Sequence, residues 1–169
     1  NYGGKKYTPV WNHSYTYIAS VIRTAVRDKT ALDLEIATKK KEGADAAIAL
    51  VDTVGNIETA NYVRNIVDGT TNPYTSNPPS PFYNYFQLGV NAIKAAITEN
   101  ETDGSAVVAK QEAEAEKVVI HNEHTDAGTA NTNANTDGHP ILDSFSGTIK
   151  SVGVKGLRKT VTTVGTADL

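Results

Sequence analysis

Hydrophobic residues recur at helical spacing near the start of the chain. Residues 15–28 carry apolar side chains at positions i, i+3, i+4, i+7 and i+8, which predicts a helix capped by Asn12 or Ser14. The apolar positions are Ile18, Val21, Ile22, Ala25 and Val26. Because they fall on one face, this helix is expected to bury that face against the rest of the molecule.

The same spacing resumes after Gly43 and predicts a second helix that ends at Gly55. A third, shorter helix follows and ends at Gly69, because glycine commonly terminates helices. The next segment, residues 69–81, holds four of the six prolines and is expected to be a surface loop.

Two further helices are predicted from their start signals. Ser80 is a capping residue and Pro81 suits the first helical turn, so a helix is expected from there to about Asn100. Ser105 caps a last helix through about residue 123, which is rich in Ala, Glu, Lys and Gln. Three aromatic residues of the first of these helices share one face and are expected to lie in the protein core: Phe82, Tyr85 and Phe86.

Other segments alternate as strands do. Leu32–Ile36 alternates apolar and acidic residues, which favours a strand, with a continued helix capped by Thr30 as the alternative. The run Tyr7–Trp11 is also strand-like. Beyond Pro140 the apolar residues lie among Thr, Ser and Gly, and predict two or three short strands.

These patterns together predict an α+β protein. Its mainly helical body of three to five helices carries a short N-terminal arm and a β-rich C-terminal tail. Residues 125–138 have no apolar side chain larger than alanine and are assigned to a polar spacer. The expected domains are an arm (1–11), a helical body (12–124, with the Pro-rich loop 69–81), the spacer (125–138) and a β-hairpin-like tail (139–169).

The net charge of −3 conceals a segmental polarity. Residues 1–41 carry a net charge of +5, residues 42–97 of −3, residues 98–137 of −7 and residues 138–169 of +2. The basic ends can therefore fold back on the acidic helix of their own chain, or lie on that of a neighbouring copy. The near-neutral total does not favour nucleic acid as a direct sequence-specific ligand.

Composition excludes several classes of chemistry. The chain has no cysteine, which excludes a disulfide scaffold, thiol catalysis, thiolate zinc sites, iron–sulfur clusters and covalently attached haem. The longest apolar run, Ala46–Val51, is far shorter than the roughly 20 residues of a membrane span. We find no Walker loop, Gly-x-Gly-x-x-Gly or Gly-x-Ser-x-Gly motif, and expect neither enzymatic activity nor a cofactor.

The residues closest to a chemical signature lie near the end of the acidic helix. His121 and His124 are three residues apart and can share a helix face, and imidazole suits zinc, copper or nickel. No third ligand follows at a fixed spacing, so no metal site is expected. Glu112, Glu114 and Glu116 are interpreted as part of a solvated helix face rather than as acid–base carboxylates.

Basic residues at both ends and two tyrosines beside the Pro-rich loop are the interface candidates: Lys5, Lys6, Tyr74, Tyr83, Lys150, Lys155, Arg158 and Lys159. Asn12 and Asn100 begin N-glycosylation sequons. Because the chain starts at Asn1 rather than methionine, it is expected to be cut from a longer precursor. These features favour an extracellular, cell-surface or virion location.

We therefore expect a non-enzymatic structural subunit that self-assembles into an extracellular filament or a virion (capsid, tail or pilus-like). Exchange of the arm and tail, together with charge complementarity, would join copies of the chain. A contact with a glycan or a host surface is compatible with the same features. The alternative is a monomeric secreted binding or adhesion domain that uses the Tyr-rich loop 69–86, and the third hypothesis is an enzyme with a dispersed active site.

Overall fold

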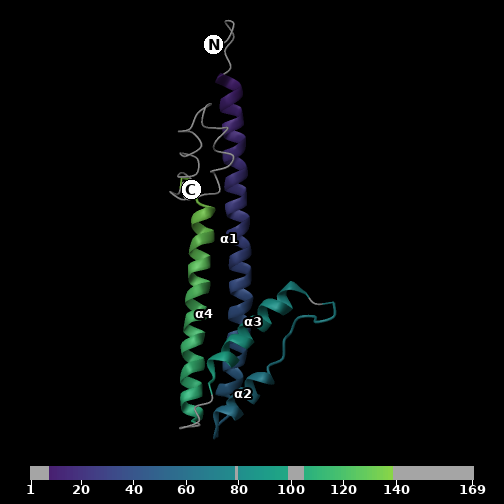
Figure 1. Cartoon of the computed structure of the whole chain (residues 1–169), viewed down its shortest axis with the longest axis vertical. Coiled ribbons are helices and arrows are strands. Elements are labelled where there is room, and N and C mark those ends of the chain that lie inside the picture. Colours follow the sequence, from purple (N-terminus) through teal and green to yellow (C-terminus); the bar gives the residue numbers. More distant parts are fainter. Residues whose placement is uncertain (1–7, 79, 99–104, 139–169) are drawn as a thin grey trace. The chain divides into compact units, whose positions relative to one another are not determined.

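The computed structural model describes residues 8–78, 80–98 and 105–138, with side chains from Tyr17 onward. Four helices lie in this part of the chain: α1 (Thr8–Asp52), α2 (Ala60–Asp68), α3 (Pro81–Ala96) and α4 (Ala106–Ala134) (Figure 1). The chain divides into two compact units. We call Leu32–Gly128 the central unit, and Asn1–Ala31 with Thr129–Leu169 the terminal unit.

The α+β class expected from the sequence is wrong for the described residues, which contain helices and no strand. Helix α1 includes both the Leu32–Ile36 segment and residues 8–11 of the other strand-like run. Leu32 is 49% exposed, Leu34 approaches Gly128 of α4, and Ile36 lines a groove beside α3. Because this helix has neighbours on more than one side, its apolar residues are not confined to one stripe and can imitate an alternating strand. The predicted β-rich tail, residues 139–169, lies outside the described residues.

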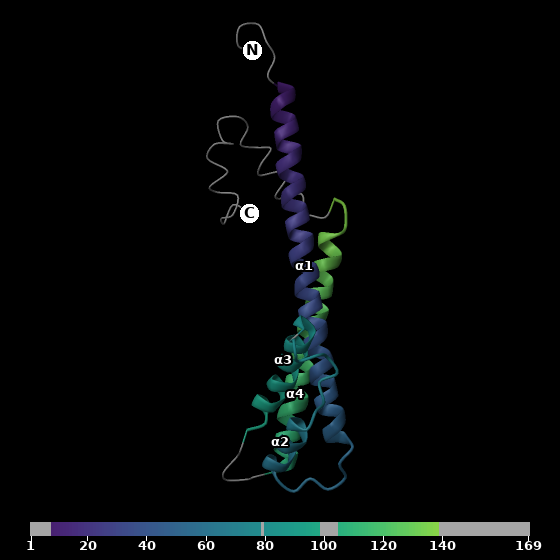
Figure 2. The ribbon, with the colours of Figure 1, turned by 90° about the vertical axis from the view of Figure 1, so that its right-hand side faces the viewer.

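The core of the central unit is built by all four helices. Its largest fully buried side chains include Ile48 of α1, Val63 of α2, Ile93 of α3 and Ile120 of α4. Within this unit α4 lies along α1 in the opposite direction (Figures 1 and 2). Ala44 and Ala47 of α1 and Ala109 and Ala113 of α4 are buried in its core. Each fully buried Val or Ile contributes roughly 1.5–3 kcal/mol through removal of apolar surface from water.

Helix α3 crosses α1 in direct backbone contact. A Cβ atom added to Gly43 would lie 2.0 Å from the carbonyl oxygen of Phe86, and one added to Gly89 would lie 1.9 Å from that of Lys40. These separations are far shorter than any carbon–oxygen contact, so the crossing requires glycine at both positions. The pair therefore sets how closely α3 approaches α1.

Two predicted helix boundaries are confirmed, the start of α3 and the end of α2. Ser80 accepts a hydrogen bond from the Tyr83 N–H at the start of α3, and Pro81 occupies its first turn. Helix α2 ends at Gly69, as expected. Helix α3 ends at Ala96, earlier than predicted. Phe86 is buried, but Phe82 is 38% exposed, so its assignment to the core is wrong.

Helix α4 continues to Ala134, past the predicted end near residue 123 and through most of the segment assigned to a spacer. In the terminal unit, Ala134 is 1% exposed, and its carbonyl oxygen accepts a hydrogen bond of 2.9 Å from Arg27 Nε. The Arg27 guanidinium also pairs with Asp137 at 3.0 Å. The polar segment is helical because α1 supplies contacts that it cannot make alone. The division into arm, body, spacer and tail stays a prediction.

Candidate functional site

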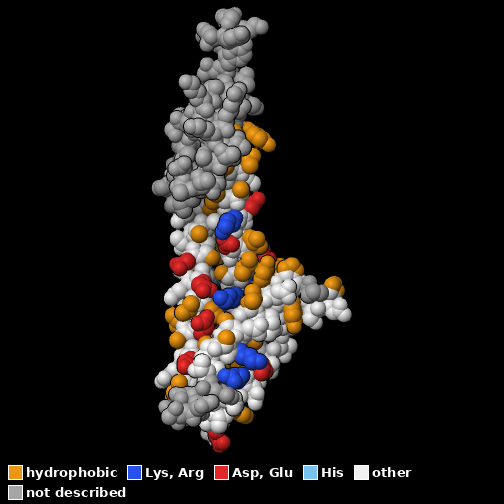
Figure 3. All heavy atoms as spheres, viewed as in Figure 1, with side chains coloured by type: hydrophobic (Ala, Val, Ile, Leu, Met, Phe, Trp, Pro, Cys, Tyr) orange, Lys and Arg blue, Asp and Glu red, His pale blue; other side chains and the backbone are white. Residues whose placement is uncertain are grey.

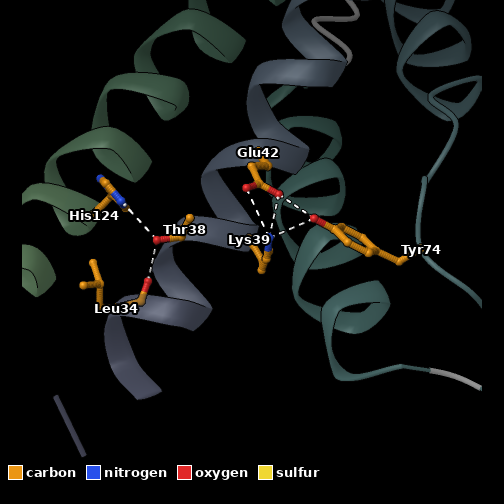
Figure 4. A network of polar contacts seen from close by, with 6 residues as sticks. All are labelled: Leu34, Thr38, Lys39, Glu42, Tyr74 and His124. Atoms are coloured by element: carbon orange, nitrogen blue, oxygen red, sulfur yellow. Dashed lines mark hydrogen bonds and ion pairs between the residues drawn. The ribbon is translucent and has the colours of Figure 1, made fainter. Parts of the chain in front are cut away.

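A polar network in the central unit ties the Pro-rich loop to α1 (Figure 4). The Tyr74 hydroxyl donates to Glu42 Oε2 at 2.8 Å and accepts from Lys39 Nζ at 2.9 Å. The Tyr74 ring lies edge-on to Phe86, with ring centroids 5.9 Å apart. Both ends of Tyr74 are therefore engaged inside the chain, the hydroxyl with α1 and the ring with α3.

The same network keeps Lys39 protonated. The hydrogen bond with Tyr74 is the main cause that raises the pKa of Lys39, and Glu42 raises it further, against a smaller lowering by burial. The ammonium nitrogen also lies 5.1 Å from the ring centroids of both Tyr74 and Phe82, within cation–π range. The ammonium of Lys39 therefore joins α1 to the Pro-rich loop through Tyr74.

The two histidines that were weak metal candidates make separate contacts with α1. His121 Nε2 lies 2.6 Å from Asp45 Oδ1, and His124 Nε2 lies 3.1 Å from Thr38 Oγ1. The Thr38 hydroxyl donates its one proton to the Leu34 carbonyl at 2.7 Å, so it accepts from His124 (Figure 4). No group of three or more His, Cys, Asp or Glu residues that could hold a metal occurs in the part of the chain that the structure describes.

The glutamates of α4 that were interpreted as a solvated face lie at its sides. Glu112 Oε2 accepts hydrogen bonds from the Thr98 hydroxyl at 2.7 Å and from the Thr98 N–H at 3.0 Å, and both lower the pKa of Glu112. On the same helix, a hydrogen bond with Asp52 at 2.8 Å raises the pKa of Lys110. These contacts fasten the start of α4 to the neighbouring segments.

An open groove lies between α1, α3 and α4 in the central unit, with a volume of about 560 Å³. The exposed surface of its lining is mostly apolar and comes from Ile36, Ala37, Leu88 and Ala92, and the polar lining residues are Asp33, Lys40, Asn91 and Glu123. Lys40 and Glu123 pair at 3.1 Å. Leu88 is 51% exposed, and hydrophobic side chains gather on the surface where α3 lies against α1 (Figure 3). The groove suits an apolar side chain better than a charged ligand.

Large apolar side chains are exposed on helices throughout the described residues. Val107 is 65% exposed and Val118 is 57% exposed on α4, and Tyr17 is 68% exposed on α1. Val21, Leu32, Tyr62 and Val119 are also exposed. Scattered exposed apolar residues are normal on a monomer, but contiguous ones on a helix face mark contact surfaces. This feature is not evident from the sequence, because the face that a helix exposes depends on its neighbours.

Few of the interface and glycosylation candidates predicted from sequence lie in the described part. Tyr74 is half-buried in the network above, and Tyr83 is half-buried beside it, with its carbonyl oxygen accepting a hydrogen bond from Asn72 Nδ2 at 3.0 Å. Asn12 lies in α1, and nothing is described of its side chain. The remaining candidates lie outside the described residues: Lys5, Lys6, Asn100, Lys150, Lys155, Arg158 and Lys159.

Among the described residues, no helix combines the length and the apolar character needed to cross a membrane. No family model, curated protein or solved structure matches the chain.

Proposed function

We propose that this chain is a non-enzymatic structural subunit that self-assembles into an extracellular filament or a virion. The observation that carries the proposal is the set of large apolar side chains exposed on the helices of the central unit. Leu88, Val107 and Val118 are each more than half exposed. Burial of such a side chain against a neighbour contributes roughly 1.5–3 kcal/mol, so repeated contacts between copies can hold an assembly together.

Charge supports the same proposal. The first 41 residues carry a net charge of +5, whereas residues 98–137 carry −7. Opposite charges on separate segments favour a contact between copies in one defined orientation. A contact that joins two different surfaces of the chain generates a ring or a helical filament. The exchange of the arm and the tail between copies belongs to this proposal.

The alternative, a monomeric binding domain, has less structural support. It requires the Tyr-rich loop 69–86 to present free aromatic groups to a partner. The Tyr74 hydroxyl is instead bonded to Lys39 and Glu42, and its ring packs against Phe86. The contacts of Tyr74 hold the loop on α1, and its hydroxyl and ring are both occupied by them.

Negative-stain microscopy of the purified chain, at low and at high salt, tests the proposal. We expect rings or filaments at low salt, and fewer or shorter ones at high salt, because salt screens charge pairs between copies. Uniform single particles under both conditions would contradict it. Persistence of the assemblies at high salt would show that apolar contacts dominate and that the charge-based part of the proposal is wrong.

A further inference from the structure

Helix α4 exposes an uncharged face on its outer side. We define the outward face of α4 as Val107, Gln111, Ala115, Val118 and Asn122, all of which are exposed. These residues recur at i, i+4, i+8, i+11 and i+15, so they form one stripe along the helix. A helix bordering only water normally carries charged residues at such positions. This stripe has none, and its two valines are its most apolar members.

The stripe lies opposite the side of α4 that packs into the core. That inner side consists of Ala106, Ala109, Ala113 and Ile120, which are at most 6% exposed. The outward face therefore does not contribute to the core, and no described part of the chain covers it. An apolar and neutral face on the far side of a packed helix indicates a contact with another helix.

The flanks of the stripe differ in charge. At 100° per residue, Lys110 and Lys117 lie on one side of it, and Glu112, Glu123 and Asp126 lie on the other. Glu114 lies on the lysine side and approaches Lys117 at 3.8 Å, so the α4 residues of that side carry a net charge of +1 against −3 on the other. Lys110 also pairs with Asp52 at 2.8 Å, and the side chains of both lysines remain partly exposed, at 45% for Lys110 and 30% for Lys117.

This difference in charge favours a second copy of α4 as the partner and a parallel orientation of the two helices. When two copies of one helix meet face to face in parallel, a two-fold axis along the helices brings the lysine flank of each against the acidic flank of the other. When they meet antiparallel, like flanks face each other and the acidic sides repel. We infer that the outward face of α4 packs against the same face of a second copy of this chain, with the two α4 helices parallel.

The expected contact is small. The face spans about 22 Å at 1.5 Å per residue, so a single helix pair covers less than the roughly 800 Å² per partner of a standard interface. Such a contact forms stably only together with others, as in a repeating assembly. The inference therefore rests on the proposed function, and it names one of the surfaces that would join the subunits.

Single cysteines test the inference, because the native chain has none. The variants Val118→Cys and Val107→Cys are each oxidised in the full chain, and disulfide-linked dimers are measured by gel electrophoresis. A disulfide requires Cβ atoms within about 4.5 Å. In the parallel arrangement each residue meets its own copy, so both variants should shift from 18.0 kDa to twice that mass. Val119→Cys is the matched control, since Val119 is exposed on the same helix but off the stripe.

The outcomes separate the inference from the proposed function. Links in both variants and few in the control support the parallel contact. Links found by mass spectrometry only between Val118→Cys and Val107→Cys in a mixture would overturn it in favour of an antiparallel pair. Links in neither variant above the control would overturn the contact altogether. Microscopy of the same samples then shows whether assembly persists through other surfaces or is absent, and absence contradicts the proposed function itself.

Discussion

Two glycines determine how α3 packs on α1. At Gly43 and Gly89 the helix backbones touch, and a Cβ atom would overlap a carbonyl oxygen of the other helix. Glycine weakens a helix by roughly 0.5–1 kcal/mol relative to alanine, and here that cost is offset by the close packing of Phe86 and Ile93 that the contact permits. Neither glycine is distinguishable in the sequence from one that ends a helix or begins a turn.

Gly89→Ala should destabilise the chain by about 3 kcal/mol, because the new methyl group meets the Lys40 carbonyl and the whole of α3 must move. Gly128→Ala is the control. Its Cβ would lie 3.8 Å from Leu34 Cδ1, an ordinary contact, so it should stabilise α4 by about 0.5–1 kcal/mol. Urea denaturation measures both free energies of unfolding. Equal effects of the two substitutions would refute the close crossing.

Glu112 should make stability depend on pH in the acid range. Its pKa is lowered in the folded chain by the hydrogen bonds from Thr98, so its contribution is present above its ordinary value of 4.5 and is lost as the pH falls through the folded pKa. In thermal melts at a series of acid pH values, Glu112→Gln should make the melting temperature fall less steeply as the pH is lowered. Thr98→Val should do so partially, because the Thr98 N–H remains as a donor. If the melting temperature of both variants depends on acid pH as that of the native chain does, Glu112 does not have this role.

Helices α1 and α4 are longer than the sequence indicates, for one physical reason. In each helix, segments that lack a clean apolar stripe are stabilised by tertiary contacts. Leu32–Ile36 alternates as a strand does, yet it lies within α1. The start of α3 and the end of α2 were predictable, because Ser80, Pro81 and Gly69 act locally, through their own backbone geometry.

The candidate site was less predictable than the helix ends. Tyr74 was identifiable as an unassigned aromatic residue, but its contacts with Lys39 and Glu42 join positions more than thirty residues apart in the sequence. The outward face of α4 could not be identified before the inner face was known. The residue types of α4 predict a helix, but they do not indicate which of its sides meets α1.

Arg27 should hold the last turn of α4. Its Nε atom donates to the Ala134 carbonyl, one of the carbonyl oxygens that a helix end leaves without a partner. Arg27→Ala should cost about 1 kcal/mol and increase amide hydrogen exchange over residues 131–135. Arg27→Lys should restore part of the protection, since it keeps the charge near the helix C-terminus. Exchange rates unchanged in Arg27→Ala would contradict this role.

At the scale of the whole molecule, the chain combines exposed apolar helix faces with segments of opposite charge. The described residues bury a core of valines, isoleucines and alanines, yet leave Leu88, Val107 and Val118 largely uncovered. With no cysteine in the chain, disulfides cannot lock the subunits together. An assembly of this chain must rely on many weak, repeated contacts, and its size should therefore depend on concentration.

Sedimentation velocity of the full chain, over a wide range of concentrations at low salt, tests self-association most directly. We expect 18.0 kDa monomers at the lowest concentrations, replaced by progressively larger species as concentration rises. A single 18.0 kDa species at every concentration would contradict it.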